Sequence, residues 1–168
     1  LFYDVRVLWK QWSLILTIIF FYLVIIFAMN APDCEAGYLG PGGIHDYQKY
    51  FNCTGGVVGL IDRSILGASH LYQRAKIRSV YDSPFPFDPE GIFGCLMSCV
   101  QVFLGVQCGV TLLIYPTARE RLRRWLSWGV GLLAFTALLT LFSIEDGIIP
   151  INKSMWSLSF VTITSGLA

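Results

Sequence analysis

The stretch LILTIIFFYLVIIFAM, from Leu14 to Met29, contains no charged residue and decides the fold class. Lys10 and Asp33 are the charged residues that flank it. Because a helix rises about 1.5 Å per residue, roughly 20 apolar residues cross a hydrocarbon core about 30 Å thick. The stretch with its uncharged neighbours meets this length, which predicts a membrane-spanning helix over about residues 11–30.

The same pattern recurs along the chain. Glu90 and Arg119 flank a longer charge-free segment, a third runs from Trp125 to Ile144, and a fourth follows Lys153. We therefore predict an all-α, polytopic transmembrane helix bundle with three complete spans and a truncated fourth. The expected spans are about 11–30, 90–115, 125–144 and 155–168, with a long loop over 31–89. We expect the 168 residues to be an internal fragment of a larger membrane protein.

The composition agrees with this class of protein. Hydrophobic residues make up 55% of the chain, charged residues 14%, and the mean hydropathy is +0.61. These values suit lipid-embedded helices better than a soluble core. The net charge of +1 identifies no partner, and we expect no nucleic-acid partner.

The Lys and Arg residues predict the orientation, because short loops rich in them stay on the cytosolic side of a membrane. Arg6 and Lys10 precede the first span, and the connection between the second and third spans is crowded with arginines. We therefore expect residues 1–10 and 116–124 in the cytosol. The loop 31–89 and the turn 145–153 then face the exoplasmic or luminal side.

The luminal loop contains one segment with helical spacing. Apolar residues recur from Val57 to Leu66 and stop at Gly67, a residue that commonly ends a helix. This predicts a short amphipathic helix, with Asp62 and Arg63 near its apolar face.

The second span has a start signal and a stripe of small residues. The start signal is Asp88 as the N-cap, followed by Pro89 as the first helical residue. Glu90 then places a negative charge where the helix dipole favours it. The small stripe predicts close packing against a neighbouring helix, with a cofactor groove as the alternative. Gln101 and Gln107 should meet protein rather than lipid. The stripe comprises Gly91, Cys95, Ser98, Val102, Gly105 and Gly109.

The cysteines divide by compartment. Cys34 and Cys53 lie in the luminal loop, where they can form a disulfide with each other or with cysteines elsewhere in the protein. We expect Cys95, Cys99 and Cys108, inside the second span, to act as small packing residues. No spacing of Cys and His indicates zinc, so no metal is expected.

Two glycosylation sequons occur on the luminal side. We expect modification at Asn52, in Asn52-Cys53-Thr54. The second, Asn152-Lys153-Ser154, lies close to the fourth span, where Asn152 and Ser154 are better placed to cap a helix.

Several motifs together resemble one known family. They are GYLGPGG (37–43), NCTGGVVGLIDR (52–63), LGASHLYQ (66–73), FDPEG (87–91), FLGVQCG (103–109) and IPINKSMWSLSFV (149–161). In this order the motifs resemble the heparan-alpha-glucosaminide N-acetyltransferase family of lysosomal transmembrane enzymes. The resemblance covers nearly the whole chain and implies that residues 1–168 are part of one transmembrane acyltransferase domain.

The resemblance implies that acetyl-CoA in the cytosol, as co-substrate, acetylates the terminal α-glucosamine of heparan sulfate in the lysosomal lumen. The family's catalytic His lies on an earlier helix, and His45 and His70 do not match it. The fragment is therefore expected to be inactive alone. Its implied partners are the lipid bilayer, heparan sulfate and the missing N-terminal luminal domain and helices, with a homodimer left open.

Polar residues at the luminal helix ends are the candidates for substrate binding: Glu90, Asn152, Lys153 and Arg63. A carboxylate such as Glu90 can hold an amino sugar, and Lys153 or Arg63 can hold a sulfated chain. Helix capping, a Glu90–Lys153 ion pair or an Asp62–Arg63 ion pair explains the same residues structurally.

The cytosolic arginines are candidates for binding CoA phosphates, since guanidinium groups bind phosphate with two parallel hydrogen bonds. The positive-inside rule alone also predicts them. The four are Arg119, Arg121, Arg123 and Arg124. The sequence leaves open an acetyl-enzyme or direct transfer, a related sugar O- or N-acyltransferase with another acceptor, and a transporter, although the spans lack the charges of ion pathways.

Overall fold

A computed structural model describes residues 3–74, 76–88, 90–143 and 147–168, and within them every regular element is helical. The α-helices are α1 (Tyr3–Val7), α2 (Trp9–Ala28), α3 (Gly56–Leu66), α4 (Lys76–Tyr81), α5 (Ile92–Ile114), α6 (Ala118–Thr140) and α7 (Leu158–Leu167). Two short 3-10 helices are η1 (His45–Gln48) and η2 (Lys153–Met155). The predicted all-α class is confirmed for the described residues.

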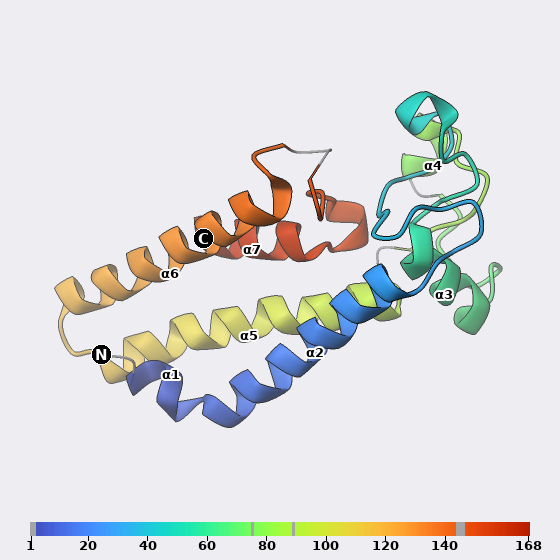
Figure 1. The fold of residues 1–168 in the computed structure, drawn as a ribbon. Helices are drawn as coiled ribbons and strands as arrows, with labels where there is room; N and C mark the ends of the chain where they lie inside the picture. The colour runs from blue at the N-terminus through green and yellow to red at the C-terminus, as the bar shows by residue number, and fades with distance from the viewer. Residues whose placement is uncertain (1–2, 75, 89, 144–146) are drawn as a thin grey trace.

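The long helices lie side by side, and the connecting segments gather at the two ends of the bundle (Figure 1). The N-terminus, α1 and the α5–α6 connection share one end. The loop that carries α3 and α4 covers the other end, close to the turn that leads into α7. Segments predicted to lie on one side of a membrane are thus neighbours in the structure.

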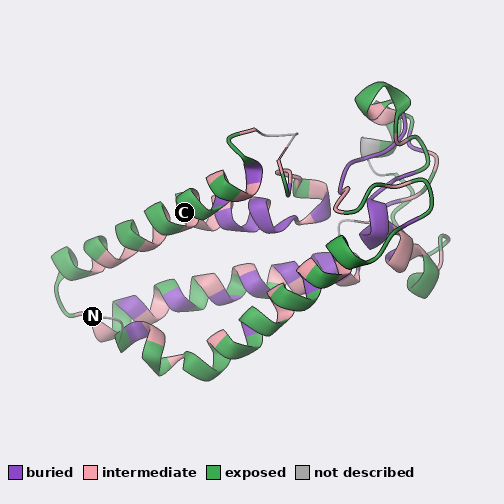
Figure 2. Cartoon of the chain, in the orientation of Figure 1, coloured by how far each residue is buried: buried purple, intermediate pink, exposed green. Residues whose placement is uncertain are grey.

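Two helices, α2 and α5, are long and apolar enough to cross a membrane. Only 17% and 28% of their most apolar windows are buried, so both present apolar side chains on the outside of the bundle (Figure 2). A buried helix of a soluble core would be covered instead. This exposure agrees with a membrane location.

The third and fourth predicted spans are shorter in the structure. The first turns of α6 carry the four arginines, so its uncharged part runs only from Trp125 to the end of the helix at Thr140. Residue 144, the expected end of the third span, lies outside the described residues. The predicted segment 155–168 begins in η2 and continues as the ten-residue α7. With 23 residues α6 is long enough to span but is not apolar enough, and α7 has only ten residues.

The core is built where α2, α5 and α7 meet. Tyr22, Met97 and Val161, one from each helix, are almost completely buried. Near the α1 end, the Trp12 ring stacks on Trp128 of α6 at a centroid distance of 5.5 Å. These contacts hold α2 and α6 together through ring area rather than through charge.

The predicted short helix of the loop 31–89 is confirmed. It runs from Gly56 to Leu66, and Gly67 follows with a positive φ of +81°. Val57 and Val58 are buried, whereas Ile65 near the end is 66% exposed. Only the first two turns therefore pack on the bundle.

The predicted start of the second span is wrong by about one turn. The helix begins at Ile92, and the side chain that accepts its first backbone N–H is Asp62 of α3, at 3.0 Å. Asp88 instead accepts the backbone N–H of Glu90 at 2.9 Å, within the preceding turn. Gly91 allows the approach, because a Cβ there would lie 2.0 Å from an Asp62 carboxylate oxygen.

The predicted small-residue seam meets no neighbouring helix at Gly105 and Gly109 among the described residues, so its packing stays a prediction. A Cβ added at Gly105 or Gly109 meets no atom within 4 Å, and the three cysteines of α5 are exposed. The close helix approach lies elsewhere, between α6 and α7. A Cβ at Gly129 would come within 2.9 Å of the Gly166 carbonyl oxygen.

Both glutamines of α5 meet protein, as predicted. Gln107 is buried, accepts a hydrogen bond from the Trp12 indole at 2.8 Å and donates to Asp4 at 3.3 Å. Gln101 donates to the Thr164 hydroxyl of α7 at 3.3 Å. These amides join α5 to the neighbouring helices.

Candidate functional site

A cleft of about 1030 Å³ opens between the loop 31–89 and the α6–α7 turn. One wall comes from the loop segment 35–50 with Tyr81, and the other from residues 147–154. Its lining includes four tyrosines, one histidine, two carboxylates and one lysine: Tyr38, Tyr47, Tyr50, Tyr81, His45, Glu35, Asp46 and Lys153. Aromatic faces beside charged groups are suited to a polar ligand with an apolar face, such as a sugar.

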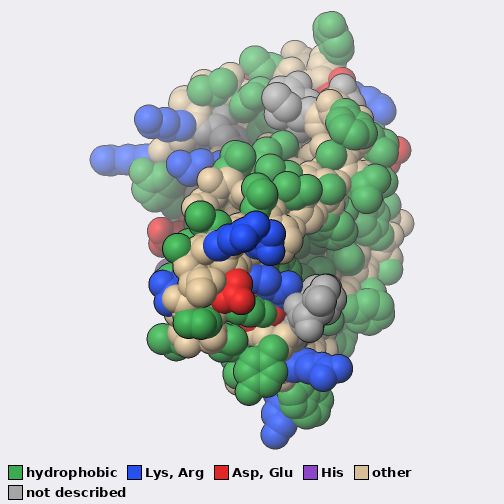
Figure 3. All heavy atoms as spheres, turned by 90° about the vertical axis from the view of Figure 1, so that its left-hand side faces the viewer, with side chains coloured by type: hydrophobic (Ala, Val, Ile, Leu, Met, Phe, Trp, Pro, Cys, Tyr) green, Lys and Arg blue, Asp and Glu red, His purple; other side chains and the backbone are tan. Residues whose placement is uncertain are grey.

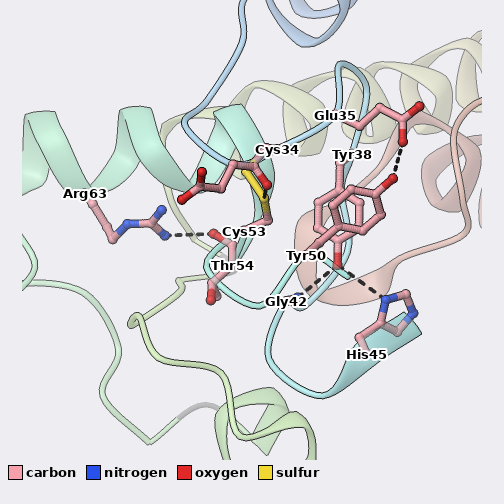
Figure 4. The surroundings of a disulfide bond; sticks show 10 residues. Cys34, Glu35, Tyr38, Gly42, His45, Tyr50, Cys53, Thr54 and Arg63 are labelled. Carbon is pink, nitrogen blue, oxygen red and sulfur yellow. Dashed lines mark hydrogen bonds between the residues drawn. A yellow bond between two sulfur atoms is a disulfide. The ribbon is translucent and has the colours of Figure 1, made fainter. Parts of the chain in front are cut away.

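The aromatic wall of the cleft is held by a small polar network (Figure 4). The rings of Tyr38 and Tyr50 lie 4.6 Å apart between centroids, and the Tyr50 hydroxyl donates to the Glu35 carboxylate. The Lys49 ammonium lies 3.8 Å from the same carboxylate. Glu35 is thus placed at the rim with its charge partly balanced.

His45 belongs to this wall. The Tyr38 hydroxyl accepts the Gly42 backbone N–H at 3.1 Å and lies 3.3 Å from Nδ1 of His45. Burial raises the pKa of Tyr38, and the Gly42 hydrogen bond opposes this rise. Burial therefore favours the protonated phenol, which can serve as a donor in its contact with Nδ1 of His45.

The cleft wall is tied to α3 by a disulfide. Cys34 and Cys53 are bonded to each other, which is the first of the two pairings that the sequence leaves open. The bond joins residues 19 apart in sequence and lies directly before α3 (Figure 4). A covalent link here restricts the loop that carries Glu35, Tyr38 and Tyr50.

Two of the four predicted substrate-binding residues line the cleft. The Asn152 amide donates to the Leu39 carbonyl oxygen at 2.9 Å and accepts the Ser154 N–H at 3.0 Å. It thus caps η2 and joins the turn to the loop. The neighbouring Lys153 is exposed at the cleft.

The other two predicted residues lie outside the cleft. Glu90 is exposed at the start of α5. Arg63 donates to the Thr54 carbonyl oxygen at 2.8 Å and lies over the Phe85 ring at 5.0 Å. Desolvation lowers the pKa of Arg63, and the charge of Asp62 opposes this effect. Neither of the two ion pairs considered for these residues forms among the described residues.

His70 lies beside the end of α3 and is not part of the cleft lining. Its Nδ1 lies 2.8 Å from the Leu66 carbonyl oxygen at the end of α3. The contact places the imidazole against the last turn of α3, next to Gly67, where the helix ends.

The second polar region lies at the opposite end of the bundle, where Lys and Arg side chains gather (Figure 3). Two of the four predicted phosphate-binding arginines already have partners. Arg124 forms an ion pair with Asp4 at 2.5 Å, and Arg121 donates to the Tyr115 carbonyl oxygen at 2.7 Å. Arg119 and Arg123 are exposed, so they are the members of the cluster that an anion can reach.

Asp4 is the residue that the sequence analysis missed. Its side chain is fully buried and accepts from Gln107 at 3.3 Å and Tyr115 at 3.4 Å as well as from Arg124. The sequence signal for its role was that Asp4 is a single acidic residue in the segment 1–10, which is expected to be basic. This network connects α1, α5 and α6 and is a structural centre rather than an open site.

The remaining site predictions concern Asn52 and metals. Asn52 is exposed, whereas the next two residues of its sequon, Cys53 and Thr54, are buried. Within the described ranges, no three His, Cys, Asp or Glu side chains gather in a way that would hold a metal ion.

The fold and cleft define a segment of membrane helices with a disulfide-closed loop at one end. No protein-family model matches the chain. Its sequence is 45% identical over 166 residues to heparan-alpha-glucosaminide N-acetyltransferase of Homo sapiens and 43% identical to that of Mus musculus. Each match covers 98% of this chain and about a quarter of the relative's length, 25%. The resemblance predicted from the motifs is therefore confirmed.

Proposed function

We propose that this chain is part of a lysosomal membrane acetyltransferase that moves acetyl from cytosolic acetyl-CoA to the terminal α-glucosamine of heparan sulfate. The observation that carries the proposal is the 45% identity along 98% of the chain to an enzyme named for this transfer. The cleft supports it, because it offers aromatic and charged groups at the end of the bundle opposite to the arginines.

The two ends of the bundle suit the two substrates. At the arginine end, Arg119 and Arg123 are free to bind the phosphates of CoA. At the cleft end, Glu35 and Asp46 can attract the ammonium group of glucosamine, and the tyrosine rings can stack on the sugar. Lys153 can contact a sulfate or carboxylate of the chain.

The base that deprotonates the acceptor amine comes from outside this chain in our proposal, on a preceding helix. The described residues then bind and orient the acceptor, and the rest of the protein completes the site. The fragment alone is inactive in this view, and whether acetyl passes through an enzyme-bound intermediate is decided by groups outside it.

The test is transfer of labelled acetyl from acetyl-CoA to glucosamine by membranes that contain the full-length protein. We expect CoA-dependent acetylation that requires access to both faces. Movement of glucosamine or heparan fragments without acetylation would indicate a transporter. Acetylation of a different sugar in preference to glucosamine would indicate a related acyltransferase.

Lys153→Gln tests the cleft itself. We expect a higher KM for a heparan sulfate acceptor with kcat little changed, because Lys153 is exposed and contacts only the bound chain in the proposal. Arg6→Gln, a charge removal at the other end of the bundle, is the control. An unchanged KM in Lys153→Gln would remove this residue from acceptor binding.

The topology is part of the proposal. Residues 1–10 and 116–124 face the cytosol, residues 31–89 and 145–153 face the lumen, and α6 and the segment of α7 complete four crossings in the full protein. Cysteine labelling in sealed vesicles should find Lys49→Cys and Arg123→Cys reactive from opposite faces. Glycosidase treatment should shift the full-length protein but not its Asn52→Gln variant.

A further inference from the structure

A second groove, distinct from the cleft, lies beside α4 in the luminal loop. Its volume is about 650 Å³, and Arg74 and Arg78 line it together with Gln73, Ser79, Asp82 and Phe51. Figure 1 places α4 at the edge of the loop that points away from α2 and α5. The groove, lined by residues of α4, therefore lies at a distance from the apolar surface of the bundle.

The sequence around this groove has an unusual charge pattern. From Arg63 to Tyr81 there is no acidic residue, whereas Arg74, Lys76 and Arg78 all fall within it. The membrane orientation does not require these charges, because long loops cross to the luminal side largely regardless of charge. A separate reason for this basic surface is needed.

The two arginines are differently held, and neither is neutralised. Arg78 donates to the side-chain oxygen of Gln73 at 3.4 Å, and Gln73 is fixed by bonds to the carbonyl oxygens of Ala68 and Leu71 at 2.6 and 2.9 Å. Arg74 is exposed. Asp82 also lines the groove but forms no ion pair with either arginine in the described structure.

The groove floor is anchored to the wall of the cleft. The Ser83 hydroxyl, buried beneath the groove, donates to the Pro41 carbonyl oxygen at 2.7 Å, and the Ile44 N–H donates to the Tyr81 carbonyl oxygen at 2.7 Å. Tyr81 lines the cleft and Asp82 lines the groove. Because Tyr81 and Asp82 are consecutive, the cleft and the groove are adjacent. A polysaccharide that leaves the cleft can therefore enter the groove.

We propose that the α4 groove binds the sulfate and carboxylate groups of the sugars that follow the acceptor residue in a sulfated polysaccharide. This inference rests on the proposed function, which puts the terminal sugar in the cleft. Guanidinium groups bind such oxyanions with paired hydrogen bonds. An anionic lipid surface is disfavoured because α4, beside the groove, lies at the edge of the loop away from α2 and α5 (Figure 1).

The test compares three acceptors in the full-length protein: free glucosamine, a sulfated heparan sulfate hexasaccharide ending in glucosamine, and its desulfated counterpart. For Arg74→Ala/Arg78→Ala we expect the KM of the sulfated hexasaccharide to rise about tenfold, since each lost charged contact at an exposed site is worth roughly threefold. The KM of glucosamine and the kcat should stay within about twofold.

Two further variants keep the result interpretable. Arg74→Ala alone removes an exposed side chain, so it should fold normally and show a smaller part of the same effect. Arg6→Gln/Lys10→Gln removes the same charge at the opposite end and should leave every KM unchanged. Equal KM increases for the sulfated and desulfated hexasaccharides would overturn the proposal.

Direct binding separates this inference from the proposed enzyme function. If no acceptor is acetylated, the enzyme proposal fails, but binding of the sulfated hexasaccharide by the full-length protein still tests the groove. Loss of that binding in Arg74→Ala/Arg78→Ala supports the site, and equal binding by wild type and variant refutes it. Binding to phosphatidylserine vesicles that depends on the two arginines, in place of hexasaccharide binding, would refute it in favour of a membrane contact.

Discussion

The buried ion pair between Asp4 and Arg124 yields the sharpest stability prediction. Asp4 is 0% exposed, and the Arg124 side chain is 14% exposed. Arg124→Gln leaves the carboxylate with two long hydrogen bonds from neutral groups, Gln107 at 3.3 Å and Tyr115 at 3.4 Å. Removing one partner of a buried pair costs about 3–5 kcal/mol, and the neutral donors offset about 1 kcal/mol of this. We expect a net loss of about 3 kcal/mol, roughly a hundredfold in the folding equilibrium.

The assay is reversible unfolding of the full-length protein by SDS titration in mixed micelles. Arg123→Gln is the matched control, because Arg123 is the exposed neighbour and should change stability by less than about 0.5 kcal/mol. Asp4→Asn/Arg124→Gln should recover about 2 kcal/mol, since it removes the uncompensated charge. The reasoning is refuted if Arg124→Gln matches the Arg123 control, or if the double variant is no more stable than Arg124→Gln.

Three other predictions follow from the luminal loop and the α6–α7 contact. Burial raises the pKa of Asp62 above its ordinary 3.8, although the backbone hydrogen bond at the α5 start opposes the rise. The Asp62 carboxyl thus binds its proton more tightly in the folded protein than in the unfolded chain. The contribution of Asp62 to stability therefore falls as pH rises from about 4 through the raised pKa. Asp62→Asn keeps a hydrogen-bond acceptor and should make the thermal midpoint nearly independent of pH between about pH 4 and 7. Asp62→Ala should lose about 1 kcal/mol of stability or more. Equal pH profiles of the thermal midpoint for wild type and Asp62→Asn would contradict this. Gly166→Leu should force α7 away from Gly129 and lower the thermal midpoint. Gly105→Leu, in open space, should leave the thermal midpoint unchanged. A larger drop in the thermal midpoint for Gly105→Leu than for Gly166→Leu would show that a partner covers Gly105. Cys34→Ser/Cys53→Ser should destabilise the loop by about 3 kcal/mol, because the disulfide that closes the loop between residues 19 apart is lost. The measurement is the rate of proteolysis of the loop, which should rise. An unchanged rate would mean that packing alone holds the loop.

The parts of the fold set by local patterns could be predicted from the sequence. The continuous hydropathy of Leu14–Met29 predicts α2, and the period of the apolar residues with Gly67 predicts α3, because both signals lie within the element itself. The interior position of Gln107 follows from the cost of placing an amide in lipid. Two of the four substrate-binding candidates, Asn152 and Lys153, also line the cleft.

The parts set by distant contacts could not be predicted. The side chain at the α5 start is Asp62, 30 residues from Ile92, so the local signal at Asp88 was misleading. The choice between Gly105 and Gly129 for close packing depends on which helices meet, and small residues alone do not encode this. The Asp4–Arg124 pair joins residues 120 apart. The aromatic wall of the cleft is likewise assembled by the folding of a loop that has no regular periodicity.

The hydrogen bond from the Asn152 amide to the Leu39 carbonyl oxygen bears on how the cleft moves. Leu39 is buried beside the aromatic wall, and Asn152 leads through η2 into α7. A displacement of α7 is therefore passed to the wall of the cleft through this single hydrogen bond. The width of the cleft mouth and the position of α7 are thus mechanically coupled.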